Sequence, residues 1–192
     1  MATPSNPAPA SVLFVCLGNI CRSTMAEGVF RSLAAPHRTS LIGDIDSAGT
    51  GAYHVHDPPD DRTMSTLRAH GIKNYNHAAR KVTKDDFRTF HYILAMDQHN
   101  LRDLLRLRDS VLASQKKGSK GTTTTETELA VVRLFGDFNS DGTLNKRVGG
   151  GKEIEDPYYG GINGFEMAYE QAINYSKGLL SYLENKSAET AN

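Results

Sequence analysis

Residues 12–23 of this 192-residue chain have the sequence Val12-Leu-Phe-Val-Cys-Leu-Gly-Asn-Ile-Cys-Arg-Ser23. The segment begins with an apolar run, Val12 to Val15, which is typical of a strand buried on both faces. Beyond the loop that follows, apolar residues recur at helical spacing from Met25 to Leu33, before Pro36. A buried strand, a tight loop and an amphipathic helix in this order indicate the first unit of a parallel α/β sheet.

The same alternation continues along the chain. The predicted elements are, in order, a strand at 41–48, a helix from Asp57-Pro-Pro59 to Gly71, a strand at 91–96, a helix at 101–112, a strand at 130–135 and a helix at 165–183. Strands that alternate with helices favour a parallel sheet covered on both sides. We therefore expect an α/β fold with a four-stranded parallel sheet and helices on both faces.

The composition excludes several classes of protein. Lys plus Arg and Asp plus Glu both number 22, so the chain lacks the positive field that general nucleic-acid binders use. No apolar run approaches the roughly 18 residues of a membrane span. The two cysteines, Cys16 and Cys21, lie too close in sequence for a disulfide framework, which favours a reducing compartment, the cytoplasm.

The domain organisation follows from changes in polarity along the chain. Residues 1–10 contain three prolines and no charged side chain, so we expect a disordered leader there rather than a signal or transit peptide. Residues 11–186 form one predicted domain with a polar insertion near 114–128, and residues 187–192 form a predicted tail.

The loop after the first predicted strand carries residues suited to phosphate chemistry. Backbone N–H groups converge at a helix N-terminus and bind anions there. Cys16 faces the same field, which together with the guanidinium of Arg22 stabilises its thiolate and makes it a nucleophile. The planar fork of Arg22 also holds two phosphate oxygens.

The small and polar residues of the loop support this interpretation. Gly18 permits close approach of the backbone to a ligand, Asn19 tolerates the left-handed conformation, and the Ser23 hydroxyl can donate a hydrogen bond to the departing sulfur. The alternative is a buried structural cysteine at a strand end, the usual role of an isolated Cys.

Residues 12–23 resemble the amino-terminal signature of the low-molecular-weight protein tyrosine phosphatases, with Thr24 where these proteins usually have Pro. Further stretches match at 46–48, 58–60, 80–87, 96–104 and 156–160. The resemblance extends from about residue 11 to the last helix, and it leaves out the leader, the insertion and residues 137–152.

The resemblance implies a protein tyrosine phosphatase that hydrolyses phosphotyrosine in proteins, and small aryl phosphates, through a cysteinyl-phosphate without a cofactor. A thiolate that attacks a phosphate monoester needs a proton donor on the leaving-group side. An Asp-Pro pair is most often a turn. In this family, however, the aspartate of Asp-Pro-Tyr-Tyr is the general acid, which assigns Asp156 to that role beside Cys16 and Arg22.

The resemblance also implies the remaining site residues. Ser47 and His77 belong to a network that holds Asn19 and the loop in shape. The residues implied to bind substrate are Leu17, Gly18, Asn19, Ile20, Cys21, Ser23, Tyr53 and Tyr158. A deep slot with aromatic walls favours phosphotyrosine over the shorter phosphoserine. Apart from the resemblance, the loop brings Cys21 back toward Cys16, so Cys21 is expected to capture an oxidised Cys16 as a disulfide; the alternative is that Cys21 only packs behind the loop.

Three related functions stay open at this point. An arsenate reductase of the same fold would need further cysteines, and this chain has none outside the loop. A bacterial protein-arginine phosphatase typically has Thr in place of Ile20. A phosphate-binding module without turnover would not need the complete set of Cys16, Arg22 and Asp156. The expected oligomeric state is a monomer or a weak homodimer.

Metal binding is not expected. Residues 137–145 match the first half of a calcium loop, but Val148 stands where such a loop needs a bidentate Glu, so a turn is favoured. Residues 149–153 lack the glycine spacing of a nucleotide loop. The seven histidines show no zinc-ligand pattern beside suitable cysteines.

Overall fold

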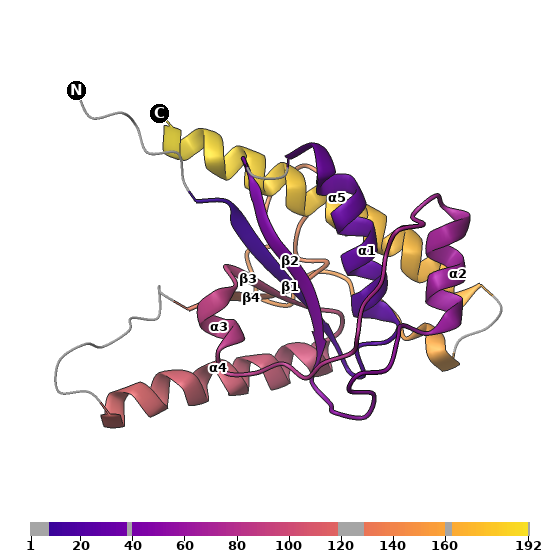
Figure 1. Cartoon of the computed structure of the whole chain (residues 1–192). Helices are drawn as coiled ribbons and strands as arrows, with labels where there is room; N and C mark the ends of the chain where they lie inside the picture. Colours follow the sequence, from indigo (N-terminus) through magenta and orange to yellow (C-terminus); the bar gives the residue numbers. More distant parts are fainter. Residues whose placement is uncertain (1–7, 38–39, 119–128, 160–162, 192) are drawn as a thin grey trace.

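The computed structural model of the protein describes residues 8–37, 40–118, 129–159 and 163–191 (Figure 1). Its elements are β1 (Ala10–Cys16), α1 (Arg22–Ala34), a 3-10 turn (Ala35–His37), β2 (Ile42–Gly49), α2 (Asp61–Ala69), α3 (Asp86–Thr89), β3 (Tyr92–Ala95), α4 (Gln98–Gly118), β4 (Val131–Leu134), a second 3-10 turn (Pro157–Tyr159) and α5 (Gly164–Ala191).

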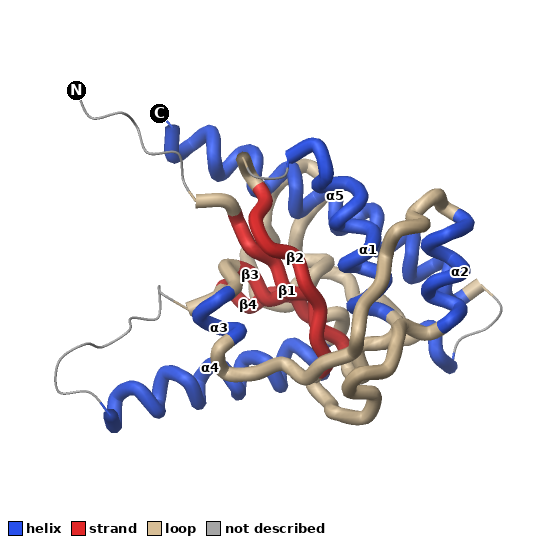
Figure 2. The backbone as a smooth tube through the Cα atoms, viewed as in Figure 1, coloured by secondary structure: helices blue, strands red, loops and turns tan. Residues whose placement is uncertain are grey.

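The four strands form one parallel sheet in the order β2-β1-β3-β4. Helices α1, α2 and α5 lie on one side of it, and α3 and α4 lie on the other (Figures 1 and 2). The predicted four-stranded parallel sheet with helices on both faces is therefore confirmed.

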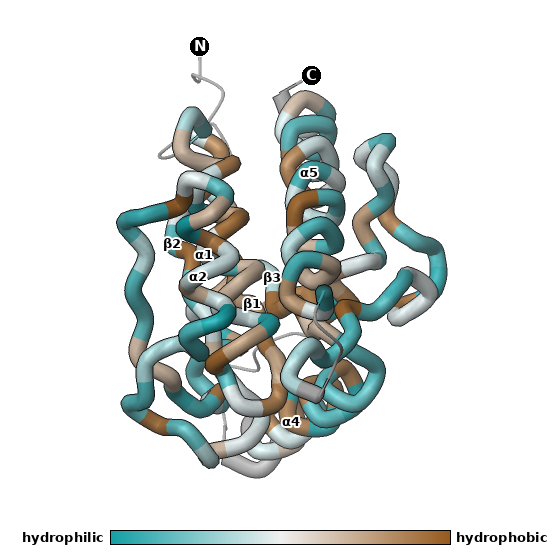
Figure 3. Tube along the Cα trace, turned by 90° about the vertical axis from the view of Figure 1, so that its right-hand side faces the viewer, coloured by the Kyte–Doolittle hydropathy of each residue, from teal (hydrophilic) through white to brown (hydrophobic). Residues whose placement is uncertain are grey.

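The side chains of β1 show why both faces must be covered. Phe14 and its i±2 neighbours Val12 and Cys16 belong to the apolar cluster shared with α1 and α5, whereas Leu13 and Val15 belong to the cluster shared with α4. All five side chains are buried. In Figure 3 hydrophobic colour accordingly gathers near β1 and β3 in the middle of the molecule, while hydrophilic colour dominates the outer loops.

The order of the strands indicates where a ligand-binding crevice is expected. The chain moves from β1 outward to β2 and then returns across β1 to β3, so the loops after β1 and β3 leave the sheet at a switch point. Ligands of open α/β sheets bind at the carboxyl ends of strands at such a point. Cys16 is the last residue of β1, and Asp97 comes two residues after β3.

Several predicted boundaries were wrong. Ala10, which we assigned to the leader, begins β1 through the hydrogen bond of its N–H to the Leu41 carbonyl. Helix α4 continues to Gly118 and so occupies the start of the expected insertion, whose residues 119–128 lie outside the described part of the chain, as do residues 1–7 of the leader.

The ends of two other helices also differ from prediction. Helix α5 extends to Ala191 where a tail was expected from residue 187. Helix α2 begins at Asp61 rather than at the prolines, because the side chain of Asp60 caps it by accepting a hydrogen bond from the Arg62 N–H at 2.9 Å. The short α3 was not predicted.

Residues 137–145, which resemble the first half of a calcium loop in sequence, form a turn that is stabilised by Asp137. Asp137 is fully buried, and its carboxylate accepts hydrogen bonds from the backbone N–H groups of Leu134, Gly149 and Gly151 at 3.2, 2.8 and 2.8 Å. This carboxylate therefore closes the base of the loop that precedes Asp156. Among the described residues, no helix is both long and apolar enough to cross a membrane.

Candidate active site

The loop between β1 and α1 wraps around the Cys16 sulfur. The Asn19 N–H points at Sγ from 3.3 Å, and the Ser23 hydroxyl lies 3.1 Å from it. Asn19 has φ 59°, the left-handed conformation that lets the loop turn this tightly. Donors from the backbone and from the first turn of α1 thus converge on one sulfur, an arrangement that favours negative charge there.

The strained Asn19 is held by its own side chain. Its amide nitrogen donates to the hydroxyls of Ser23 at 3.0 Å and Ser47 at 2.9 Å. Its carbonyl oxygen accepts from the Arg80 N–H at 2.8 Å and contacts His77 Nε2 at 2.8 Å. Ser47 and His77, to which the family resemblance gave a role in loop support, both contact Asn19.

Beneath this network lies Glu27, which sequence reasoning missed. Only 1% of it is exposed. Its Oε2 accepts hydrogen bonds from Ser47 at 2.7 Å and Tyr75 at 2.8 Å and lies 3.2 Å from His77 Nδ1, while its Oε1 pairs with Arg31 at 2.8 Å. The one feature of the sequence that could have indicated this role is that Glu27 is a charged residue within an apolar stretch of α1.

Glu27, Asp46 and His77 bring three ligand-type atoms within 4.8 Å of one another. Each of the three residues is already engaged by the protein: Ser47 and Tyr75 bind Glu27, Arg80 binds Asp46 at 2.8 Å, and Asn19 contacts His77. Burial lowers the pKa of His77. The carboxylates of Glu27 and Asp46 act to raise it, but each has a smaller effect than burial. The trio is therefore satisfied as a hydrogen-bond network without a cation.

Arg22 links the phosphate-type loop to two carboxylates. Its side chain is 5% exposed, and its two terminal nitrogens contact Asp97 at 2.5 Å and Asp156 at 3.0 Å. Burial opposes the charge of Arg22, but Cys16, Asp97 and Asp156 outweigh burial and raise its pKa. Asp97 was not assigned from sequence, although its place directly after a buried strand was a usable signal.

These residues surround a cavity of about 240 Å³. Nine of the residues expected at the site line it, namely Cys16, Leu17, Gly18, Ile20, Cys21, Arg22, Tyr53, Asp156 and Tyr158. His54, which sequence reasoning did not select, lines it too. Asn19 and Ser23, which were also expected to bind substrate, are not among the lining residues and are buried. Tyr53 and Tyr158, at 77% and 44% exposed, offer aromatic surface at the entrance.

The wall at Tyr158 is supported by Arg62. Asp60 holds the Arg62 guanidinium through two contacts of 2.9 Å, and Asp60 itself donates its N–H to the Ile20 carbonyl. The guanidinium carbon lies 5.0 Å from the ring centre of Tyr158 and 4.5 Å from that of Phe165. Arg62 therefore ties the acid segment to the loop around Cys16.

Cys21 differs in character from Cys16. It is 6% exposed, and burial, followed by the nearby carboxylate of Asp60, raises its pKa to about 12. Cys21 is thus a thiol at neutral pH. Both cysteines are free. Thr24, the departure from the family signature, donates its hydroxyl to the Cys21 carbonyl at 2.9 Å.

Comparison with known proteins gives a consistent result. A family model described as low molecular weight phosphotyrosine protein phosphatase matches residues 11–189. The protein of that name from Gallus gallus is 45% identical over 170 residues, which is 88% of this chain and 93% of the relative.

Two solved structures share the fold. A protein tyrosine phosphatase from Entamoeba histolytica with Hepes in its active site has a TM-score of 0.71 at 30% identity, covering 92% of this chain and 98% of the other. The Drosophila arginine phosphatase DARP has a TM-score of 0.69 at 31% identity, covering 89% and 96%.

Proposed function

The chain belongs to the low molecular weight phosphotyrosine protein phosphatase family and is a protein tyrosine phosphatase, and we propose that Cys16, Arg22 and Asp156 carry out its reaction. One observation supports this proposal above the others. The three residues come from the end of β1, the start of α1 and a segment more than 130 positions further on, yet all three line one cavity.

In the first step, the Cys16 sulfur attacks phosphorus and forms a cysteinyl-phosphate. The loop N–H groups and the Arg22 guanidinium hold the phosphoryl oxygens, whose charge is stabilised where it is largest in the transition state. Asp156 gives its proton to the departing phenol oxygen. Its carboxylate lies 3.0 Å from Arg22, so the acid and the phosphate-binding group share one face of the cavity.

In the second step, water hydrolyses the cysteinyl-phosphate. Asp156, now ionised, takes a proton from the attacking water, and the P–S bond breaks. The Ser23 hydroxyl, 3.1 Å from Sγ, donates a hydrogen bond to the sulfur as it leaves with its negative charge. No step needs a metal ion or a cofactor.

We infer that the physiological substrates are phosphotyrosine side chains of proteins. We also infer that the enzyme acts in the cytoplasm, because a catalytic thiol stays reduced there. Cys16 lies at the floor of the cavity with 3% exposure, so a phosphoryl group must reach it on a long side chain. Ile20 lines the cavity with an apolar side chain, which suits an aryl ester better than a guanidinium. Arsenate reduction is disfavoured because it would need further cysteines outside the loop, and the two cysteines of this chain both lie in it.

The test replaces the nucleophile with an atom that cannot ionise at neutral pH. Cys16→Ser should abolish hydrolysis of p-nitrophenyl phosphate, because a serine hydroxyl has too high a pKa, while phosphate still binds through the loop and Arg22. Cys21→Ser is the matched control and should keep most of the activity. Turnover near wild type in Cys16→Ser would reject Cys16 as the nucleophile.

A further inference from the structure

A second cavity lies at the opposite end of the sheet from the active site. It has a volume of about 470 Å³, and its lining includes the first residues of three strands, Ala10 of β1, Tyr92 of β3 and Val131 of β4. Strand β1 runs from this cavity to Cys16, which separates the two sites by roughly 20 Å at about 3.3 Å per residue. The volume is within the range of roughly 300–1,000 Å³ that is usual for small-molecule sites.

The walls of this cavity carry charge of one sign only. Among the residues that the structure describes, the basic side chains Arg88, His91 and Lys186 line it, and no aspartate or glutamate does. His91 is engaged by Ser11, whose N–H and hydroxyl lie 3.1 and 2.8 Å from its Nδ1. Arg88 pairs with Asp85 at 3.4 Å. Of these three described residues, Lys186 is thus the one whose charge remains for a ligand.

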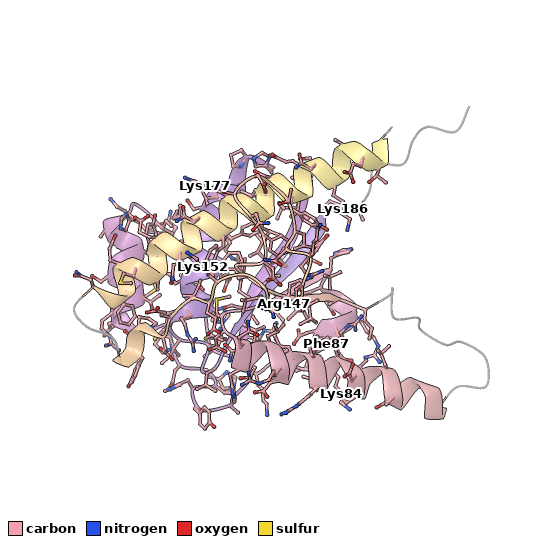
Figure 4. The ribbon with its side chains drawn as sticks, turned by 180° about the vertical axis from the view of Figure 1, so that it is seen from behind. Lys84, Phe87, Arg147, Lys152, Lys177 and Lys186 are labelled. Atoms are coloured by element: carbon pink, nitrogen blue, oxygen red, sulfur yellow. The ribbon has the colours of Figure 1, made fainter. Side chains whose placement is uncertain are left out.

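Lys186 is fixed in place by aromatic side chains. Its ammonium donates to the Tyr92 hydroxyl at 2.9 Å and lies 5.5 and 5.9 Å from the ring centres of Tyr92 and Tyr182. Within the described part of the chain, no carboxylate lies within 4.0 Å of it. An ammonium has three protons to donate, so its contact with Tyr92 leaves two for an anion. Figure 4 shows Lys186 on the carboxyl-terminal half of α5.

The remainder of the lining is largely apolar. Leu41, Phe90, Leu129, Val131 and Leu183 contribute hydrocarbon or aromatic surface from four different segments. Burying an apolar body against such a wall is favourable by roughly 25 cal/mol per Å². The cavity therefore combines one available positive charge with a wall that prefers hydrocarbon to water.

We propose that this cavity is a second ligand site that binds a small amphipathic monoanion, an aliphatic or aryl carboxylate whose head pairs with Lys186. The hydrocarbon part fills the space between β4 and α5, in contact with Val131 and Leu183. The site is independent of the phosphatase reaction, because none of its lining residues lines the cavity at Cys16.

Calorimetric titration with decanoate tests the proposal, with decanol as the neutral probe of equal chain length. The full-length protein is titrated with orthovanadate present to occupy the phosphate-binding loop. We expect saturable decanoate binding that Lys186→Met weakens at least tenfold, about 1.4 kcal/mol, while decanol binding is unchanged. Lys177→Met, on the exposed side of the same helix, is the matched control and should bind decanoate like wild type.

A second variant keeps Lys186 and changes the apolar wall. Val131→Asp adds a negative charge at a half-exposed edge position and should abolish decanoate binding without preventing folding, which the phosphatase activity reports. The proposal is overturned if decanoate does not bind saturably, if orthovanadate competes with it, or if Lys186→Met retains the wild-type affinity.

Discussion

Replacing Glu27 by Gln changes one buried carboxylate, on which the geometry of the phosphate-binding loop depends, into a neutral amide. The carboxylate is 1% exposed and supports Ser47 and His77, and these two residues hold Asn19 at φ 59°. Glutamine has the same shape but is neutral and has one acceptor oxygen instead of two. The variant therefore tests whether the loop is held by charge or by shape alone.

The expected loss of stability follows from the contacts of each carboxylate oxygen. Oε2 accepts from Ser47 and Tyr75, and the glutamine carbonyl will take this position because it preserves both bonds. Each bond changes from a charged to a neutral acceptor, a loss of about 1 kcal/mol apiece. The amide then faces Arg31, whose 45% exposed side chain loses a pair worth at most about 1 kcal/mol. We expect about 3 kcal/mol in total.

Urea unfolding followed by circular dichroism measures this free energy, with the m-value as a check that the unfolded state is unchanged. Hydrolysis of p-nitrophenyl phosphate measures the effect on the loop. Because small displacements of catalytic groups cost up to about a hundredfold, we expect kcat/KM to fall about ten- to a hundredfold. Glu170→Gln, an exposed change on α5, is the control and should stay within about 0.5 kcal/mol.

The reasoning fails if Glu27→Gln loses less than about 1 kcal/mol and keeps wild-type kcat/KM, since charged acceptors are worth more than that in a buried network. A stability loss of the expected size without any loss of activity would show that Asn19 keeps its conformation without the network. Tyr75→Phe separates the two effects, because it removes one donor to Glu27 and leaves in place the contacts of Ser47 and His77 with Asn19.

Three further predictions address the acid, the aromatic wall and the second cysteine. Asp156→Asn should lower kcat by about 10² to 10⁴, most for aryl phosphates with poor leaving groups, and an equal loss across leaving groups would contradict its role as the acid. Arg62→Leu removes the cation–π contact with Tyr158, worth about 0.5–1 kcal/mol, and should raise KM for aryl phosphates about two- to fivefold. Arg68→Leu on the same helix is the control and should leave KM unchanged. Equal KM values in the two variants would show that Arg62 does not support the aromatic wall. After peroxide treatment, added thiol should restore the phosphatase activity of wild type but not that of Cys21→Ser, and equal recovery in both would mean that Cys21 only packs behind the loop. Because burial raises the pKa of Cys21 to about 12, the rate at which its thiolate captures oxidised Cys16 should rise about tenfold per pH unit between pH 7 and 9.

The sequence by itself determined the features whose causes lie within one turn or one strand. The apolar run at Val12–Val15 is stable only inside a core, and the apolar residues after it recur at helical spacing, so β1 and α1 were predictable. Cys16 and Arg22 lie six positions apart across a single loop, and their juxtaposition needs no distant part of the chain.

Only the tertiary structure decided the order of the strands and the partners of buried polar groups. Glu27 looks like any helical glutamate in the sequence, and it becomes a buried acceptor because Ser47 and Tyr75 reach it from other elements. Asp137 shows the converse: its acidic neighbourhood resembled half a metal loop, but its carboxylate points at backbone N–H groups up to fourteen positions away. Burial and hydrogen-bond partners depend on segments that meet only after folding, so residue pattern alone could not assign these two carboxylates.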